Sequence, residues 1–260
     1  MTGINDSPSL INSDIGISVD SAVDIAKETA DIILLEKDLN VLLEGVKEGR
    51  KIYTNLIKYI KLATSFNFGE VVSVIIASIA LPFLPETPIQ LLVEGLIYDF
   101  GQLTLPFDNV DSENLNKPRN WDTDDLKRFM LIMGPLSSAF DIFVFSLMWF
   151  GFNLRANNIQ LFQTIWFTYS IVSNLVGMHV IRTNKKPFLE SHASKSVYIS
   201  SITISLVAIF VPYTILGKAI GLVPIGSKYI VLFIMLIPLI YCFVAQFVKR
   251  KYIKEYEKWL

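Results

Sequence analysis

The stretch that decides the fold covers residues 39–81 and reads LNVLLEGVKEGRKIYTNLIKYIKLATSFNFGEVVSVIIASIAL. It contains no proline, its first half carries many charged side chains, and its second half is almost wholly apolar. This pattern predicts one continuous helix that starts in water and ends in lipid. At about 1.5 Å per residue its length would be roughly 60 Å, about twice the hydrocarbon thickness of a bilayer.

Two polar residues interrupt the apolar half of this helix. Asn67 and Glu70 are three residues apart and therefore lie on one helical face. A carboxylate at membrane depth costs about 2.5 to 3.5 kcal/mol on insertion scales, so it points to a partner, a proton or a cation. The alternative interpretation is that Glu70 only holds neighbouring helices together.

The composition indicates a membrane protein. Of 260 residues, 52% are hydrophobic and 18% charged, and the mean hydropathy is +0.47, which is too apolar for an ordinary soluble domain. The net charge is only -1, and no nucleic-acid partner is expected. The single Cys242 excludes a disulfide within the chain, and the N-terminus lacks the pattern of a signal peptide. We expect a polytopic membrane protein inserted through its internal helices.

Residues 1–38 have a different character. The β-branched runs IGISV and DIILLE flank the helix candidate SAVDIAKETA, a strand, helix, strand order typical of parallel sheets. Fewer than about 40 residues rarely build a sufficient core, so we expect the end of a larger α/β domain whose front lies outside this chain.

Six apolar segments follow, each close to the roughly 20 residues that cross a bilayer. They cover residues 56–81, 88–106, 129–152, 160–181, 197–217 and 228–248. The fold class is therefore mainly α, a bundle of six transmembrane helices preceded by a short α/β remnant. Lys and Arg are concentrated in the loops 107–128 and 182–195 and in the tail 249–258, so the positive-inside rule places both termini in the cytoplasm.

The second apolar segment, PIQLLVEGLIYDFGQLTLPF, also carries polar residues at membrane depth, above all Asp99 and Gln102. Gly95 and nearby glycine and proline residues suggest a helix that unwinds locally and frees backbone carbonyls as ligands. Carboxylate, amide and carbonyl oxygens suit Mg²⁺ or Ca²⁺. Because a short connection makes the first two segments antiparallel neighbours, Asn67 and Glu70 could face Asp99 and Gln102.

Three further polar residues have ordinary structural interpretations. Glu94 would reach toward the membrane surface or face another helix, and a helix-to-helix hydrogen bond is at least as good an account of Asp141 as a functional role. His179 is expected to be a packed residue and is left out of the site.

Several motifs resemble those of P-type ATPases. TGINDSPSL at residues 2–10 resembles their hinge motif T-G-D-G-x-N-D-x-P-x-L, and the following residues resemble the end of their phosphorylation domain. Asn67-Phe-Gly-Glu70 and Tyr98-Asp99 resemble their fifth and sixth membrane helices. Residues 105–135, with LFQTIWF, HVIRTNKKPF and the tail AQFVKRKYIKEYEKW, are similar to the magnesium-importing bacterial branch.

This resemblance implies four regions. Residues 1–38 would be the remnant of the phosphorylation domain and 39–55 the stalk helix. Residues 56–106 would be the ion-site membrane helices five and six, and 107–260 helices seven to ten.

The resemblance also implies a function and a set of ligands. Asp6 would help hold Mg²⁺ beside the phosphorylated aspartate, while Asn67, Glu70 and Asp99 would bind the transported ion, with Gln102 in support. The parent enzyme would couple ATP hydrolysis to Mg²⁺ import across the bacterial plasma membrane. Its partners would be the bilayer, Mg²⁺ and the missing N-terminal part, which would bind ATP.

Some features depart from the family pattern. The hinge lacks its Asp-Gly pair, and Glu70 stands where magnesium pumps often have asparagine, which leaves Ca²⁺ as an alternative ion. The sequence Lys117-Pro118-Arg119 departs from the Pro-Pro-Arg pattern of calcium pumps and speaks against that alternative.

The motifs D-K-T-G-T and T-G-E and the nucleotide-binding domain are absent from the sequence, so the chain alone is expected not to hydrolyse ATP. A non-catalytic membrane subunit or regulator of a separate pump half is therefore the alternative function. A passive cation channel or carrier is a weaker alternative, because such a protein does not need a long polar stalk helix.

Overall fold

A computed structural model describes residues 3–36, 38–116, 118, 120–155 and 158–260. Some residues used in the sequence analysis lie outside the described residues. They are Thr2 of the hinge sequence and Lys117 and Arg119 of the loop 107–128. The chain forms two compact units, Met1–Ile52 and Tyr53–Leu260, each of which is described by itself.

The first unit contains the predicted strand, helix, strand order. Its elements are η1 (Ile4–Asp6), α1 (Ser7–Ile11), β1 (Ile17–Val19), α2 (Asp24–Glu28) and β2 (Ile32–Leu34). The two strands pair in parallel, with Ile17 opposite Ile32, which confirms the predicted pattern. Its core consists of Leu10, Ala22 and Ala26 with Val19 against them. The assignment of residues 1–38 to the end of a larger domain stays a prediction.

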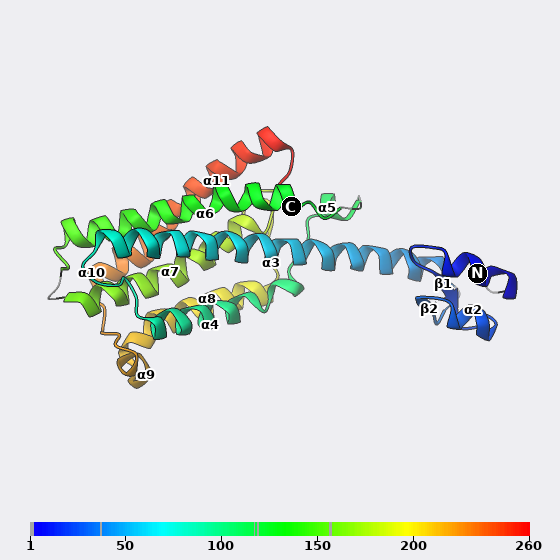
Figure 1. The fold of residues 1–260 in the computed structure, drawn as a ribbon, viewed down its shortest axis with the longest axis horizontal. Coiled ribbons are helices and arrows are strands. Elements are labelled where there is room, and N and C mark those ends of the chain that lie inside the picture. Colours follow the sequence, from blue (N-terminus) through cyan, green and yellow to red (C-terminus); the bar gives the residue numbers. More distant parts are fainter. Residues whose placement is uncertain (1–2, 37, 117, 119, 156–157) are drawn as a thin grey trace. The chain divides into compact units, whose positions relative to one another are not determined.

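The long helix is confirmed. Helix α3 runs without interruption over Leu39–Ala80, a length of 42 residues (Figure 1). The charged first half and apolar second half therefore belong to one rod of about 60 Å.

The membrane unit is built from helices. They are α4 (Pro88–Gln102), η2 (Leu105–Phe107), α5 (Ser112–Asn116), α6 (Thr123–Ser146), η3 (Leu147–Gly151), α7 (Ile159–Ile181), α8 (Lys195–Phe210), η5 (Val211–Tyr213), α9 (Ile215–Ala219), α10 (Ser227–Tyr229), η6 (Ile230–Leu236) and α11 (Ile237–Tyr256). Among the described residues, 5 helices are long and apolar enough to cross a membrane. Helix α4, on the second predicted segment, has 15 residues and is shorter than the roughly 20 needed for a full span.

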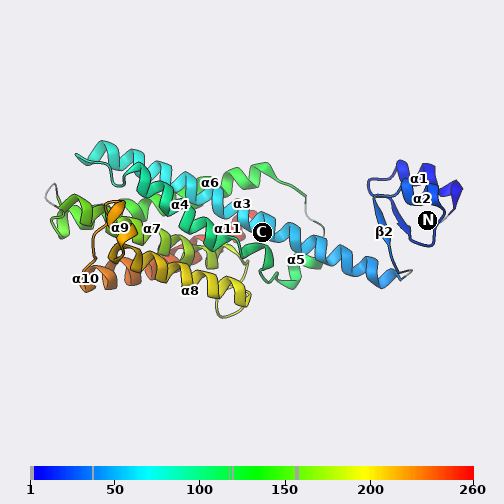
Figure 2. The ribbon, with the colours of Figure 1, turned by 90° about the horizontal axis from the view of Figure 1, so that it is seen from below.

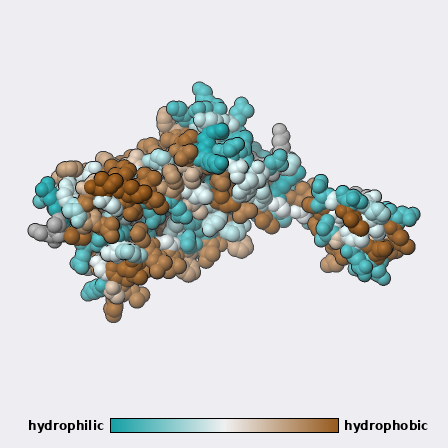
Figure 3. Space-filling model, in the orientation of Figure 1, coloured by the Kyte–Doolittle hydropathy of each residue, from teal (hydrophilic) through white to brown (hydrophobic). Residues whose placement is uncertain are grey.

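Helix α7 differs from the other spans in its burial. In its most apolar window 94% of the residues are buried, against 22 to 33% in the other four spans. Helices α4, α8 and α11 pack along it (Figure 2). The other spans keep large apolar side chains such as Ile79 and Phe243 on the outside. Hydrophobic side chains therefore cover much of the visible surface of this unit (Figure 3), as expected for a bundle that contacts lipid.

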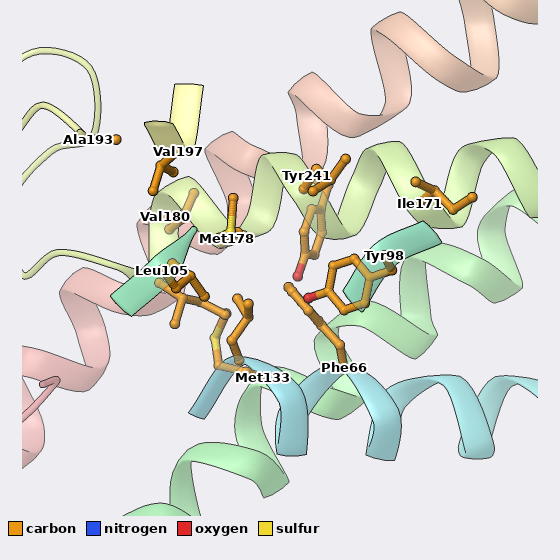
Figure 4. Packing of buried hydrophobic residues seen from close by; sticks show 14 of the residues in the cluster. Phe66, Tyr98, Leu105, Met133, Ile171, Met178, Val180, Ala193, Val197 and Tyr241 are labelled. Carbon is orange, nitrogen blue, oxygen red and sulfur yellow. The ribbon is translucent and has the colours of Figure 1, made fainter. Parts of the chain in front are cut away.

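The core joins α3, α4, α6, α7 and α11. Figure 4 shows Phe66, Tyr98, Met133 and Tyr241 converging from four of these helices. The rings of Phe66 and Tyr98 meet edge to face with centroids 6.2 Å apart, which fixes α3 against α4 at the level of the predicted ion ligands.

Candidate cation site

Helix α4 turns a polar face inward and an apolar face outward. Its buried residues include four at a spacing of four, Gln90, Glu94, Tyr98 and Gln102. The exposed residues Leu92, Leu96 and Phe100 lie on other faces of the same helix. A helix with this inverted pattern suits an apolar surrounding and presents its polar groups to its neighbours α7 and α8.

The predicted unwinding around Gly95 is wrong for this chain. Helix α4 continues through Gly95 to Gln102, so the carbonyls there stay within the helix. Gly95 is exposed and has open space beside it, and apolar surroundings penalise free carbonyl groups. Gly101 has a packing role instead, because Ser200 of α8 donates a hydrogen bond to its carbonyl at 3.1 Å.

The predicted cation ligands lie around the contact between α3 and α4. Both Glu70 and Asp99 act electrostatically on the Tyr98 hydroxyl, so both carboxylates lie within electrostatic range of this side chain. Glu70 is half-buried, whereas Asn67 and Asp99 are exposed. Gln102 is buried, and its Oε1 accepts no hydrogen bond from the described residues.

The four predicted ligands do not form a closed metal site in the part of the chain that the structure describes. Within those residues no group of three His, Cys, Asp or Glu side chains could hold a metal ion. Glu70 and Asp99 both lie within electrostatic range of Tyr98, and Asn67 and Asp99 are exposed. The assignment of Asn67, Glu70, Asp99 and Gln102 as cation ligands stays a prediction.

Glycine explains how α3 approaches α6 beside Glu70. A Cβ added to Gly69 would lie 2.8 Å from the carbonyl oxygen of Gly134, which is closer than real Cβ atoms come. Ser138 of α6 donates a hydrogen bond of 2.8 Å to the carbonyl of Gly69. The two backbones therefore touch through small residues, as is typical of membrane helix pairs.

Asp141 belongs to this same interface. Its Oδ2 accepts a hydrogen bond of 2.6 Å from Ser73 of α3, and its Oδ1 accepts a weaker one of 3.5 Å from the indole nitrogen of Trp166 in α7. The interpretation of Asp141 as a helix-to-helix hydrogen-bond acceptor is thereby confirmed.

His179 is likewise a packed residue, as expected. It stacks on Tyr198, and its Nε2 lies 3.1 Å from the hydroxyl of Ser201.

Sequence reasoning missed the pairing of two buried glutamates. Glu86 lies in the connection between α3 and α4, and Glu94 lies two turns into α4. They are 2% and 3% exposed. The Glu94 carboxyl is close enough to Glu86 and to Ser170 of α7 for side-chain hydrogen bonding. Glu94 therefore faces another helix instead of reaching toward the membrane surface. Because Glu86 lies outside the helix, the sequence carried no periodic signal of this pairing.

A second buried charge cluster, also missed, lies past the other end of α4. Asp108 is fully buried, and its Oδ2 lies 2.8 Å from both Lys58 Nζ of α3 and Arg182 Nε at the end of α7. Burial alone would raise the pKa of Asp108, but Lys58 and Arg182 hold it below its usual value. This cluster fastens α3, the loop after α4 and α7 to one another.

Lys61 makes a further anchor one turn along α3. Its Nζ lies 2.6 Å from Asp125 Oδ2 and 2.6 Å from the carbonyl oxygen of Trp259. Trp259 is buried and donates a hydrogen bond to the carbonyl of Ile181. The charged half of α3 is thus tied to α6, α7 and the tail by buried polar contacts.

Asp6 lies in the first unit. It ends η1 and accepts a hydrogen bond of 3.0 Å from the backbone nitrogen of Gly3 through Oδ2. Its expected role at a phosphorylation-site Mg²⁺ stays a prediction.

Comparison with known proteins places the chain among ion pumps. Residues 83–251 match the family of cation-transporting ATPases, C-terminus. The chain belongs to this family. It is 48% identical over 260 residues to "Magnesium-transporting ATPase, P-type 1" of Salmonella typhimurium strain LT2, which covers 99% of this chain and 28% of that protein. The protein of the same name from Escherichia coli K12 is 47% identical over 257 residues, with 98% and 28% covered.

A calcium pump is more distantly similar. "Calcium-transporting ATPase" of Bacillus subtilis is 28% identical over 220 residues, with 81% of this chain and 24% of that protein covered. The predicted resemblance to the magnesium branch is therefore confirmed. The chain is homologous to the C-terminal membrane region of these pumps and spans about 28% of the length of the magnesium-transporting relatives.

Proposed function

We propose that this chain serves as the C-terminal membrane portion of a P-type ATPase that couples ATP hydrolysis to Mg²⁺ import across the bacterial plasma membrane, and that it is inactive alone. The observation that carries this proposal is the identity of 48% to a magnesium-transporting ATPase over 99% of the chain. ATP binding and phosphorylation would belong to a partner segment that supplies the remaining part of the pump, with Asp6 beside the phosphorylation-site Mg²⁺.

In this proposal Glu70 and Asp99 are the charged ligands of the transported ion, and Asn67 and Gln102 support them. The electrostatic influence of both Glu70 and Asp99 on Tyr98 supports this pairing. So does the buried Oε1 of Gln102, which accepts no hydrogen bond from the described residues. Mg²⁺ requires octahedral oxygen ligands, so further oxygens would come from water or from the partner segment.

The exposure of Asn67 and Asp99 supports a partner that covers them. An amide and a carboxylate that face hydrocarbon are costly, whereas the same groups turned toward further helices can complete a site. We therefore infer that the face of α3 and α4 carrying Asn67 and Asp99 receives the missing membrane helices.

The placement of basic groups supports cytoplasmic termini. Lys58, Arg182 and Lys249 are all buried at the end of the bundle where α4 and α7 end, and Lys249 donates hydrogen bonds to the carbonyls of Val180 and Thr183. Under the positive-inside rule this end faces the cytoplasm.

The test is Mg²⁺ flux into liposomes with a trapped Mg²⁺ indicator, in the presence of ATP. The chain is reconstituted alone and with the N-terminal half of a magnesium-transporting relative. We expect flux only in the mixture, and we expect Asp99→Asn to abolish it because the ion loses a charged ligand. Asp124→Asn, at an exposed position at the start of α6, is the matched control and should retain flux.

Flux unaffected by Asp99→Asn would overturn the ligand assignment. No flux in the mixture, with both halves folded and associated, would favour the alternative of a regulatory subunit. Glu70→Asn addresses the ion: it should leave Mg²⁺ flux in place if Glu70 only tunes the site. If the chain instead serves Ca²⁺, Ca²⁺ should support flux in the unaltered chain and Glu70→Asn should abolish it.

A further inference from the structure

Glu86 and Glu94 form a pair of buried carboxyls without a basic partner among their strongest interactions. Each is at most 3% exposed, and each is close enough to the other for a side-chain hydrogen bond. The charged groups that act most strongly on the pair are themselves acidic, namely Glu70 of α3 and Asp141 of α6. Ser170 of α7 is the neutral group beside Glu94.

The connection that carries Glu86 is held in place on both sides. The carbonyl of Leu84 accepts a hydrogen bond of 2.9 Å from Gln163 of α7. Thr87 and Gln90 cap the start of α4 reciprocally, and Gln90 Nε2 donates to the carbonyl of Ile220 at 3.0 Å. The Glu86 carboxyl is therefore positioned against Glu94 by the fold and is not a loop side chain free to swing into water.

Three of the four carboxyl oxygens of the pair accept no hydrogen bond from the described residues. No donor of the described residues reaches either carboxyl oxygen of Glu86, and Glu94 Oε2 is likewise without one. Two ionised carboxylates in this position would repel each other, and burial would penalise each charge. Burial, followed by the charge of Glu94, raises the pKa of Glu86 well above its usual value.

A proton resolves this conflict better than a metal ion. The described residues contain no group of three acidic, His or Cys side chains that could hold a metal ion. Mg²⁺ bound by these two carboxyls would have to keep most of its water ligands, and both side chains are almost closed to solvent. One proton converts the repulsion into a hydrogen bond from the carboxyl O–H of one glutamate to the carboxylate of the other.

We propose that Glu86 and Glu94 form a proton-binding site that holds one proton between the two carboxyls, separate from the predicted cation ligands. The folded pair has one proton and one negative charge, and the proton is exchanged with water. This inference depends on the contacts within this chain and not on the proposed transport of Mg²⁺. Because Glu70 acts electrostatically on both carboxyls, removing its charge should make the pair release its proton more readily.

The test is infrared spectroscopy of the whole chain in lipid, titrated between about pH 5 and pH 9. Carboxyl-¹³C glutamate labelling shifts the bands of glutamates and leaves those of Asp141 and other aspartates unchanged. We expect an isotope-sensitive band of a protonated glutamate at neutral pH in the unaltered chain. Its absence would overturn the proposal without any variant.

Variants assign the band to the pair. Glu86→Gln and Glu94→Gln should each remove it at neutral pH, because the glutamine amide then donates to the remaining carboxylate in place of the shared proton. Glu70→Gln should shift its loss to lower pH. Glu113→Gln, whose parent side chain is 61% exposed, is the matched control and should leave the band unchanged.

Two outcomes would contradict the proposal at this stage. A band that persists unchanged in both Glu86→Gln and Glu94→Gln would place the proton elsewhere. Loss of the band from the unaltered chain when Mg²⁺ is added at constant pH would mean that the pair binds the cation in place of the proton. The double variant Glu86→Gln/Glu94→Gln, whose amides can pair with each other, guards against misfolding of the single variants and should also lack the band.

Discussion

Two groups of buried carboxyls near opposite ends of α4 are treated in opposite ways by the fold. Asp108 is fully buried, and two buried bases, Lys58 and Arg182, share its Oδ2. Glu86 and Glu94 are nearly as buried, yet the strongest electrostatic influences on them come from other acids. The charge of Asp108 is neutralised by bases of the same chain. In the pair of Glu86 and Glu94, one charge is neutralised by a bound proton.

This difference separates a structural role from a chemical one. A carboxylate held by two cations has little affinity left for a further positive charge, and its removal strands the cations. A carboxyl pair without a cation retains affinity for a proton and can respond to pH. Burial alone therefore does not identify a functional acid, and the sign of the neighbouring charges does.

The largest expected effect is at Asp108, the carboxylate that is paired with two bases. Asp108→Asn should destabilise the membrane unit by about 3–5 kcal/mol, because Lys58 and Arg182 stay buried without their counter-charge. Equilibrium unfolding in mixed micelles measures the loss, and a thiol-reactive dye on the single, half-buried Cys242 reports the exposure of α11. Asp124→Asn, an exposed aspartate, is the control.

The pH dependence of this effect has a defined sign. Because the pKa of Asp108 is lowered in the folded state, its stabilisation is present above its unfolded pKa of about 3.9 and is lost as the pH falls through the folded value. Unaltered chain and Asp108→Asn should therefore differ at neutral pH and converge in acid. Equal stability of the two at neutral pH would show that the cluster is not a structural fastener.

Asp141 is an intermediate case and should show an intermediate effect. It is buried and forms no ion pair with the described residues, but Ser73 and Trp166 donate hydrogen bonds to it. Asp141→Asn should cost about 1 kcal/mol in the same unfolding measurement, because the amide can keep one of these hydrogen bonds. A loss as large as that of Asp108→Asn would mean that the negative charge of Asp141 is itself needed, and would extend the predicted cation site to α6.

The sequence predicted the elements whose signal is local. The long helix follows from a charge and hydropathy gradient along 42 consecutive residues, and the parallel strands follow from two β-branched runs. The unwinding of α4 was wrong because the sequence does not show which way Gly95 faces. A glycine on an exposed face leaves the backbone hydrogen bonds unaffected.

The two buried charge groups were missed because their partners are distant in sequence. Lys58 was interpreted as one of the charges in the first half of the long helix, and Arg182 as a signal of topology. They lie 50 and 74 residues from Asp108 and meet it only in the folded chain. Glu86 was passed over as part of a short connection between apolar segments. Residue types gave the candidate ligands Glu70 and Asp99, but which acid has a cation beside it depends on packing between helices.

The smallest expected effect is at an exposed ion pair. Comparing it with the buried pair of Lys58 and Asp108 isolates the contribution of burial to stability. Lys258 Nζ lies 2.6 Å from Asp122 Oδ2, closer than the 2.8 Å between Lys58 and Asp108. The hydrogen bond from Lys258, with the backbone nitrogen of Asp125, lowers the pKa of Asp122 to about 2. Lys258→Met should therefore raise that pKa toward its usual value, as measured by titration of the carboxyl carbon in NMR spectra.

The stability of the chain should change little in Lys258→Met, because water screens the pair. The lowered pKa means that the small contribution is present above about pH 4 and disappears as the pH falls through about 2, so the two proteins should converge in acid. A loss at neutral pH comparable to that of Asp108→Asn would show that distance governs these pairs. The expected contrast shows instead that a shorter ion pair in water stabilises the fold less than a longer one from which water is excluded.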